Sequence, residues 1–153
     1  MRMKKALGAL SVLLFVAVHV PVASAQTTAD REAIHDLMWR YARAFETLDP
    51  DLYVSLFTKD GRFGPTQGHD ALRATIEKLK KSRADSPREY LLITNARIEF
   101  VDATHARHHH YYMTAFAATQ GGSPTVTGVG SGVDELVKID GKWLIQTRLA
   151  SQK

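Results

Sequence analysis

The residues with the most evident chemical potential form one run in the second half of the chain, His108-His109-His110-Tyr111-Tyr112. Imidazole groups can take up and release protons near neutral pH, and they can also bind metal ions. The run lies in a stretch rich in aromatic and branched side chains, which predicts a β-strand. Side chains alternate along a strand, so His108, His110 and Tyr112 share one face. We predict that this even-numbered face points toward a pocket.

Two other roles stay open for the histidine run. His108 and His110 could hold a metal ion from one face of the strand, with His69, Glu46 or Asp134 as a third ligand. This spacing is not a specific metal signature and the chain has no cysteine to support it, so we predict no metal and no other cofactor. In the second alternative, one or two of the histidines lie on the outer face of the sheet, at a subunit contact.

Three glycines alternate in a later stretch, at Gly128, Gly130 and Gly132. No helix start follows them, so they do not fit a phosphate-binding loop. Glycines on one face of a strand instead allow the sheet to curve, or they make room for a ligand or another backbone.

The first predicted helix is expected to place further reactive side chains opposite the histidine run. Its apolar residues recur at helical spacing and form one stripe, Ile34, Leu37, Met38, Tyr41, Phe45 and Leu48. Thr28 or Asp30 can cap its start. A second face consists of His35, Trp39, Ala42 and Glu46, which lie well away from the stripe. We expect this helix to be covered from two directions, with Glu46 near the border of the solvated side.

Helix-capping and turn residues divide the segment that follows the first helix. Asp49 and Pro50 predict a capped second helix that ends at Phe57, and an Asp60-Gly61 turn then leads into a strand. Asp70 can cap a third helix that ends near Arg83.

Four strands are predicted after the helices, at residues 90–101, 106–119, 125–139 and 142–149. Asp140-Gly141 is a two-residue hairpin signal between the last two. Helices followed by successive hairpins indicate an α+β domain, with the helices packed against a curved antiparallel sheet.

Several of these pieces resemble SnoaL-like domains of the nuclear transport factor two-like superfamily. The matching pieces are Arg40-Tyr41-Ala42, the stretch at 56–61, Gly68 before the third helix, and Gly141-Lys142-Trp143. The resemblance runs from residue 34 to about residue 148. It implies a cone-shaped α+β fold around an internal pocket, and a homodimer formed through the convex face of the sheet.

The resemblance also implies one catalytic acid. In relatives such as scytalone dehydratase and hexachlorocyclohexane dehydrochlorinase, an aspartate near the end of the first helix works with a histidine on the first long strand. Glu46 stands in the place of that aspartate, whereas Leu91 stands in the place of the histidine. A tyrosine and a second histidine of the dehydratase fall near Pro65 and Phe116. The chain therefore keeps the acid and lacks its partners.

We hypothesise a relocated pair in which Glu46 is the general base and His110 or His108 is the proton donor. Removal of a carbon-bound proton needs such a donor, because negative charge develops on the substrate. The residues expected to line the ligand pocket are Tyr41, Phe45, Phe57, Phe63, Leu91 and Tyr112.

The N-terminus predicts export. Three cationic side chains precede an uncharged run from residue 6 to 22, and Ala23-Ser24-Ala25 fits a signal cleavage site. We therefore divide the chain into a secretory signal at 1–25 and one domain at 26–153, located in the periplasm or outside the cell. Without the signal, 17 basic side chains balance 16 acidic ones, so no electrostatic footprint for nucleic acid is left. No membrane association is expected after cleavage.

Two function classes follow from these residues. The first is an exported domain that binds a small apolar or aromatic molecule without turning it over. The second is an enzyme of lyase, isomerase or dehydratase type that acts on a small apolar or polyketide-like substrate through Glu46. The loss of the histidine at Leu91 favours the first, and the retained acid with the histidine run favours the second.

Overall fold

The computed structural model of the chain describes residues 22–83, 89–116 and 122–152. Three helices come early in the chain: α1 (Val22–Thr47), α2 (Pro50–Ser55) and α3 (His69–Ser82). Two short strands lie among them, β1 (Phe57–Phe63) and β2 (Thr66–Gln67). Four long strands follow, namely β3 (Glu89–Phe100), β4 (His105–Phe116), β5 (Thr125–Ile139) and β6 (Lys142–Gln152).

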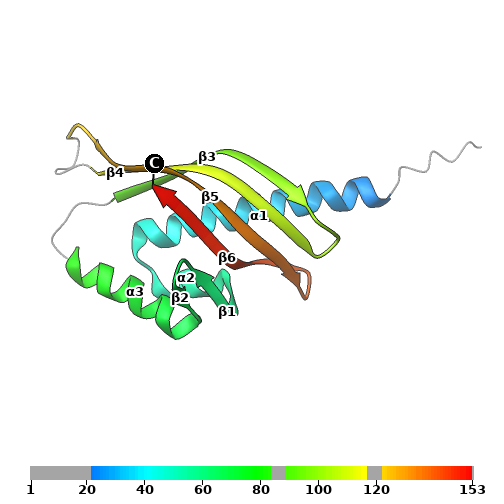
Figure 1. Cartoon of the computed structure of the whole chain (residues 1–153), viewed down its shortest axis with the longest axis horizontal. Coiled ribbons are helices and arrows are strands. Elements are labelled where there is room, and N and C mark those ends of the chain that lie inside the picture. The colour runs from blue at the N-terminus through cyan, green and yellow to red at the C-terminus, as the bar shows by residue number, and fades with distance from the viewer. Residues whose placement is uncertain (1–21, 84–88, 117–121, 153) are drawn as a thin grey trace, which may run out of the picture.

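These strands form a single curved sheet in the order β2-β1-β6-β5-β4-β3. Figure 1 shows α1 along one face of this sheet, with α2 and α3 together at the end where β1 and β2 lie. The α+β prediction is confirmed. The sheet is mixed rather than wholly antiparallel, because β1 pairs with β6 in parallel.

The apolar stripe of α1 packs into the core as predicted. Ile34, Leu37, Met38 and Tyr41 are all buried there. The helix begins earlier than predicted, at Val22, so neither Thr28 nor Asp30 caps it. Asp30 is buried instead, where its Oδ1 accepts hydrogen bonds from Trp143 Nε1 (2.9 Å) and Lys138 Nζ (2.5 Å). This contact ties α1 to β5 and β6.

The second face of α1 differs from the expectation in one respect. Its four residues do share a face, but they line an open cleft rather than a covered contact. Trp39 is 64% exposed at the rim of that cleft. The periodicity predicted that α1 is covered from two directions. No described element covers the helix at Trp39, so this prediction is wrong there.

The caps of the shorter helices are partly as predicted. Asp49 caps α2, since its Oδ1 accepts from the backbone N–H groups of Asp51 and Leu52 at 3.0 Å. The cap of α3 is Gly68, in a positive-φ conformation, and Asp70 lies within the first turn of the helix. Asp60 and Gly61 lie inside β1, where the pairing with β6 is irregular, and they do not form a separate turn.

The last hairpin matches its sequence signal closely. Asp140 and Gly141 have φ of 48° and 78°, the two positive values that a tight type I′ hairpin requires. The four long strands lie within a few residues of their predicted bounds over the described residues, and the predicted end of β4 at 117–119 falls outside them.

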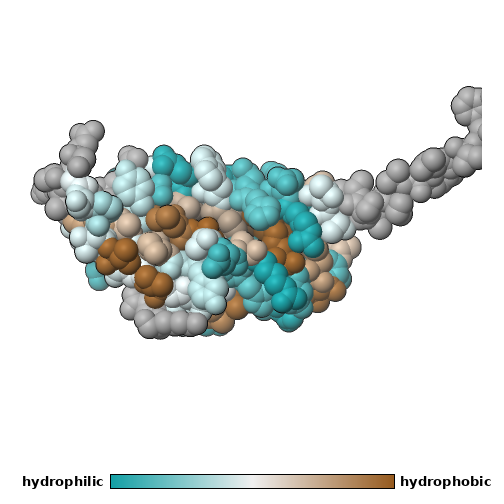
Figure 2. Space-filling model, turned by 90° about the horizontal axis from the view of Figure 1, so that it is seen from above, coloured by the Kyte–Doolittle hydropathy of each residue, from teal (hydrophilic) through white to brown (hydrophobic). Residues whose placement is uncertain are grey.

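Alternation along the long strands defines two faces of the sheet. We call the face that carries His108, Asp134 and Arg148 the inner face, and these three residues are buried. The outer face carries Tyr111, Val129 and Leu149, which are each about half exposed. Figure 2, which views the molecule from above, shows apolar side chains grouped among hydrophilic ones.

The predicted signal at 1–25 lies mainly outside the described residues. Its last residues, from 22 onward, form the start of α1. Among the described helices, none is long and apolar enough to span a membrane.

Candidate functional site

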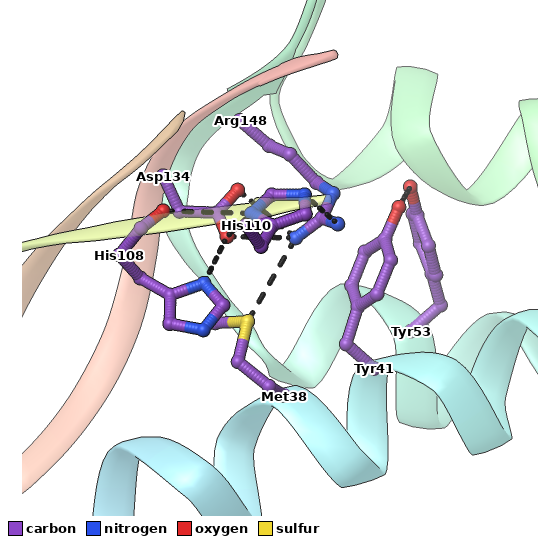
Figure 3. A network of polar contacts seen from close by, with 7 residues as sticks. All are labelled: Met38, Tyr41, Tyr53, His108, His110, Asp134 and Arg148. Atoms are coloured by element: carbon purple, nitrogen blue, oxygen red, sulfur yellow. Dashed lines mark hydrogen bonds and ion pairs between the residues drawn. The ribbon is translucent and has the colours of Figure 1, made fainter. Parts of the chain in front are cut away.

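Four buried polar side chains meet on the inner face of the sheet. His108 and His110 come from β4, Asp134 from β5 and Arg148 from β6 (Figure 3). The strand register brings them together, because His108 pairs with Asp134 and Asp134 pairs with Arg148. The even-numbered face of the histidine run thus points inward, as predicted.

Asp134 is the centre of this network. Its Oδ2 lies 3.0 Å from Nδ1 of His108 and 3.4 Å from Nδ1 of His110. Both of its oxygens accept from Nη1 of Arg148 at 2.9 Å. Burial alone would lower the pKa of Arg148, but the Asp134 carboxylate raises that pKa above its ordinary value. The guanidinium therefore stays charged and neutralises Asp134.

His110 is held in one tautomer by this arrangement. Nη2 of Arg148 lies 3.0 Å from Nε2 of His110. Arginine cannot accept a hydrogen bond, so Nε2 must carry the lone pair and Nδ1 the hydrogen. Burial, followed by the Arg148 charge, lowers the pKa of His110 from 6.5 to about 4. His110 is thus neutral at physiological pH, with Nε2 occupied by Arg148.

His108 stacks on His110, with ring centroids 5.1 Å apart, but its second nitrogen is unoccupied. Nδ1 donates to Asp134, which leaves the lone pair of a neutral ring on Nε2. Among the described residues, the only fully buried side-chain nitrogen or oxygen without a hydrogen-bond partner is Nε2 of His109. Nε2 of His108 has no such partner either, so it must reach open space, and His108 lines the cleft described next.

The helix–strand cleft lies between the second face of α1 and the edge strand β3, and its volume is about 720 Å³. Glu46 and His108 both line it. Only 11% of the Glu46 side chain is exposed. Its Oε2 lies 2.8 Å from Nη1 of Arg43, and its Oε1 accepts from the backbone N–H of Leu91 at 3.3 Å. Both oxygens of this carboxylate therefore have partners.

A second, smaller space, which we call the inner cavity, lies next to the helix–strand cleft, and Leu91 lines both. Its volume is about 130 Å³, and it is lined by Tyr41, Phe45, Phe63, Leu91, Tyr112, Thr114, Arg148 and Ala150. The guanidinium of Arg148 stacks on the ring of Tyr41 at 4.0 Å.

The alternating glycines of β5 make room for this network. A Cβ at Gly132 would lie 2.6 Å from Cε1 of His110, and one at Gly130 would lie 2.7 Å from the hydroxyl of Tyr112. The space that we predicted for a ligand or a backbone is filled by inward side chains of β4 and by carbonyl oxygens of β6.

The structure brings some predicted site residues together and separates others. Glu46 and His108 share the helix–strand cleft, whereas His110 lies against Arg148 and Asp134. No hydrogen bond or ion pair joins Glu46 to His110 among the described residues. The predicted ligand-lining residues surround the inner cavity, except Phe57, which is buried in the core.

Arg148 and the central role of Asp134 were not predicted. Asp134 appeared only as a possible metal ligand, and Arg148, in the last predicted strand, belongs to no local motif. The inward parity of the β5 glycines could have placed Asp134, since residues 128, 130, 132 and 134 alternate together.

The ligand atoms of His108, His110 and Asp134 lie within 4.8 Å of one another, which is the composition of a metal site. Of the three residues suggested from sequence as a third ligand, Asp134 lies here, whereas Glu46 lines the helix–strand cleft and His69 contacts the carbonyl of Phe57 at 3.1 Å. A cation bound by Asp134 would meet the charged Arg148, which already donates to both carboxylate oxygens. The donor set therefore fits a hydrogen-bonded network better than a metal ion.

Comparisons with known proteins give a consistent picture. A family model described as a SnoaL-like domain matches residues 26–149. No curated protein sequence matches the chain. One similar solved structure is a single-site variant of Rv3472, a protein of unknown function from Mycobacterium tuberculosis, at 28% identity and a TM-score of 0.70 over 82% of this chain and 77% of that one.

Two further structures share the fold at lower identity. A putative scytalone dehydratase from Novosphingobium aromaticivorans is 21% identical, with a TM-score of 0.71 over 85% of this chain and 88% of that one. An NTF2-like protein with a cystatin-like fold from the same species is 17% identical, with a TM-score of 0.77 over 90% and 91%.

Proposed function

Because the chain belongs to the SnoaL-like domains, we propose that it binds a small apolar or aromatic molecule and acts on it as a proton-transfer enzyme of lyase or isomerase type. One observation carries the proposal: His108 is held by Asp134 through Nδ1, its Nε2 has no hydrogen-bond partner among the described residues, and its buried side chain lines a cleft that it shares with Glu46. A histidine oriented by a buried carboxylate is a common general base.

This geometry supports the proposed reaction class. Nε2 of His108 takes a proton from a substrate carbon, and the electron pair of that C–H bond forms a new double bond. In a lyase a leaving group departs from the neighbouring carbon with its bonding pair, and in an isomerase the proton returns to a different carbon. Asp134 stabilises the imidazolium that forms, and Arg148 keeps Asp134 ionised.

Isotope exchange tests the base without knowledge of the natural substrate. A panel of small cyclic ketones in D2O is incubated with the protein, and deuterium uptake above the buffer rate is followed by mass spectrometry. We expect His108→Gln to lower the enzymatic rate by about 100-fold or more. His109→Gln, on the same strand, is the matched control and should keep the parent rate. An unchanged rate in His108→Gln would exclude this base.

Glu46→Gln tests the alternative in which Glu46 is the base and a histidine the donor. Both oxygens of Glu46 already have partners, and glutamine keeps an acceptor for the N–H of Leu91. We therefore expect Glu46→Gln to retain the exchange rate to within about tenfold. A loss as large as that of His108→Gln would reassign the base to Glu46.

A non-catalytic binding domain is the second candidate. Leu91 replaces the histidine that the resemblance implied, and the Glu46 carboxylate is paired with Arg43. This candidate is supported if ligands bind in the cleft or the inner cavity and no compound exchanges faster than in buffer. Export after cleavage near Ala25 also stays a proposal, which N-terminal sequencing of the protein recovered outside the cytoplasm would test.

A further inference from the structure

Arg148 has hydrogen-bond donors that the network does not use. An arginine side chain has five N–H groups. Those of Nη1 face Asp134 and the sulfur of Met38, and one of Nη2 faces His110. The Nε–H and the second Nη2–H have no acceptor among the described residues. Nε of Arg148 is not among the fully buried nitrogens that lack a partner, so it must reach open space.

The inner cavity is the space that Arg148 lines. Thr114 also lines it, but the only hydroxyl hydrogen of Thr127 goes to Glu89 at 2.7 Å, so the Thr114 hydroxyl donates to Thr127 at 2.9 Å and has no hydrogen left for a ligand. The Tyr112 hydroxyl has no hydrogen bond among the described residues, and its residue lines the same cavity. No carboxylate is among the described residues that line the cavity, and its remaining walls are apolar. The cavity therefore offers donors and lacks a charged acceptor.

The net charge at Arg148 determines whether a charged or a neutral ligand oxygen binds better to its N–H groups. The positive charge of Arg148 is neutralised by Asp134 at 2.9 Å, so the cavity meets a neutral ion pair rather than a free cation. A carboxylate ligand would lose its hydration without gaining a net opposite charge. A neutral carbonyl or hydroxyl oxygen loses much less hydration and can accept the same N–H groups.

Size limits the ligand further. A cavity of about 150 Å³ with apolar walls is large enough for benzene, and the inner cavity has about 130 Å³. We infer that the inner cavity binds the oxygen-bearing end of a small neutral ring compound, a cyclic ketone or enol, through the free N–H groups of Arg148. This inference rests on the proposed function only in taking that compound as the substrate of His108.

In this binding mode, Arg148 provides the hydrogen-bond donor that the proposed reaction needs. When a proton leaves the carbon beside a carbonyl, the C–H electron pair becomes a C=C bond and the carbonyl oxygen becomes an enolate. A guanidinium N–H that already binds the neutral oxygen strengthens its hydrogen bond as the negative charge develops. Arg148 would then take the place of the donor that Leu91 cannot provide.

Binding is tested in His108→Gln protein, so that the result does not depend on turnover. Three isosteric probes are titrated by calorimetry and by NMR: cyclohexanone, methylenecyclohexane and cyclohexanecarboxylate. We expect cyclohexanone to bind about tenfold or more tightly than methylenecyclohexane, and the carboxylate no more tightly than the ketone. Amide shifts should appear at Leu91, Tyr112 and Thr114. Equal affinity for the ketone and the hydrocarbon, or a tighter carboxylate, would overturn the inference.

Two variants locate the site. Ala150→Leu fills the inner cavity and should weaken cyclohexanone binding about tenfold or more, whereas Ser151→Leu, on the next residue, should not. Tyr112→Phe is a second variant that leaves the cavity open and removes the unpartnered hydroxyl, and we expect it to weaken the ketone and not the hydrocarbon. Unchanged ketone affinity in both Ala150→Leu and Tyr112→Phe would refute the site. Ketone binding here without isotope exchange in the parent would refute the proposed base and leave this inference standing.

Discussion

At the scale of single residues, Arg148 and Asp134 act by orientation more than by stability. Removing two charges from water costs several kcal/mol, and a buried ion pair often only offsets that cost. The ion pair instead fixes the orientation and the tautomer of the neighbouring histidines. Asp134 holds the Nδ1–H of His108, and Arg148 makes Nε2 of His110 an acceptor. The two histidines, two residues apart on one strand, thereby acquire different chemistry.

The depressed pKa of His110 predicts a loss of stability in acid. The ring has a pKa of 6.5 when unfolded and about 4 when folded, so the unfolded chain binds more protons between these values. The contribution of His110 to the unfolding free energy is therefore fully present above about pH 6.5, and it is lost as the pH decreases toward 4. We expect this group to contribute a loss of about 2–3 kcal/mol across that window, measured as the unfolding free energy at several pH values.

His110→Asn separates this contribution from that of the carboxylates. Asparagine can still accept from Arg148 but does not titrate, so the variant should lose part of the slope between pH 6.5 and 4. His109→Asn, half-buried on the outer face, should keep the slope of the parent. A parental slope in His110→Asn would mean that His110 is not the group that titrates.

At the scale of elements, the polar network depends on glycines in the neighbouring strand. Gly132 lies directly opposite His110 in the pairing of β4 with β5. The missing side chain leaves the volume that the imidazole occupies, and the carbonyl of Leu149 on β6 closes the same space. The glycines of β5 thus leave room for large side chains of β4 and for carbonyl oxygens of β6.

Gly132→Ala should therefore disturb the network from the next strand. Its Cβ would lie 2.6 Å from both His110 Cε1 and the Leu149 carbonyl oxygen, so the ring must move away from Arg148. We expect a loss of about 1–3 kcal/mol in unfolding free energy and altered ring signals of His110 in NMR. Gly141→Ala is the control. Its cost of about 1–2 kcal/mol comes from a φ of 78° in open space, so the His110 signals should not change.

Much of this architecture was predictable from sequence, and the network was not. Period and turn residues placed α1 to α3 and the four long strands, because those signals are local. Strand parity also gave the inward direction of His108 and His110. The predicted Asp140-Gly141 hairpin alone would place Asp134 opposite residue 147. An irregularity between Glu135 and Leu136 shifts the register so that Arg148 is the partner, and no local pattern encodes that shift. Trp39 was misjudged for a similar reason, since a helix face alone does not show which neighbour is absent.

At the scale of the whole molecule, the two faces of the sheet carry different groups of side chains. The inner face carries the buried network and both cavities lie along its side of the sheet. The outer face carries charged side chains around Glu99, Arg107 and Glu135. Further along, the same face is apolar, with Tyr111, Val129 and Leu149 about half exposed. An apolar area of this kind on a folded domain is typical of a subunit contact.

We therefore expect a homodimer that pairs the apolar part of the outer face with a second copy. Val129→Lys places a charge in that area and should shift the protein from dimer to monomer in light scattering coupled to gel filtration. Val101→Lys is the matched control, because Val101 is 53% exposed against 47% for Val129 and lies in the turn between β3 and β4. Its mass should stay dimeric. A parent protein that is monomeric at tens of micromolar, or a dimer that survives Val129→Lys, would assign the apolar outer face to another partner.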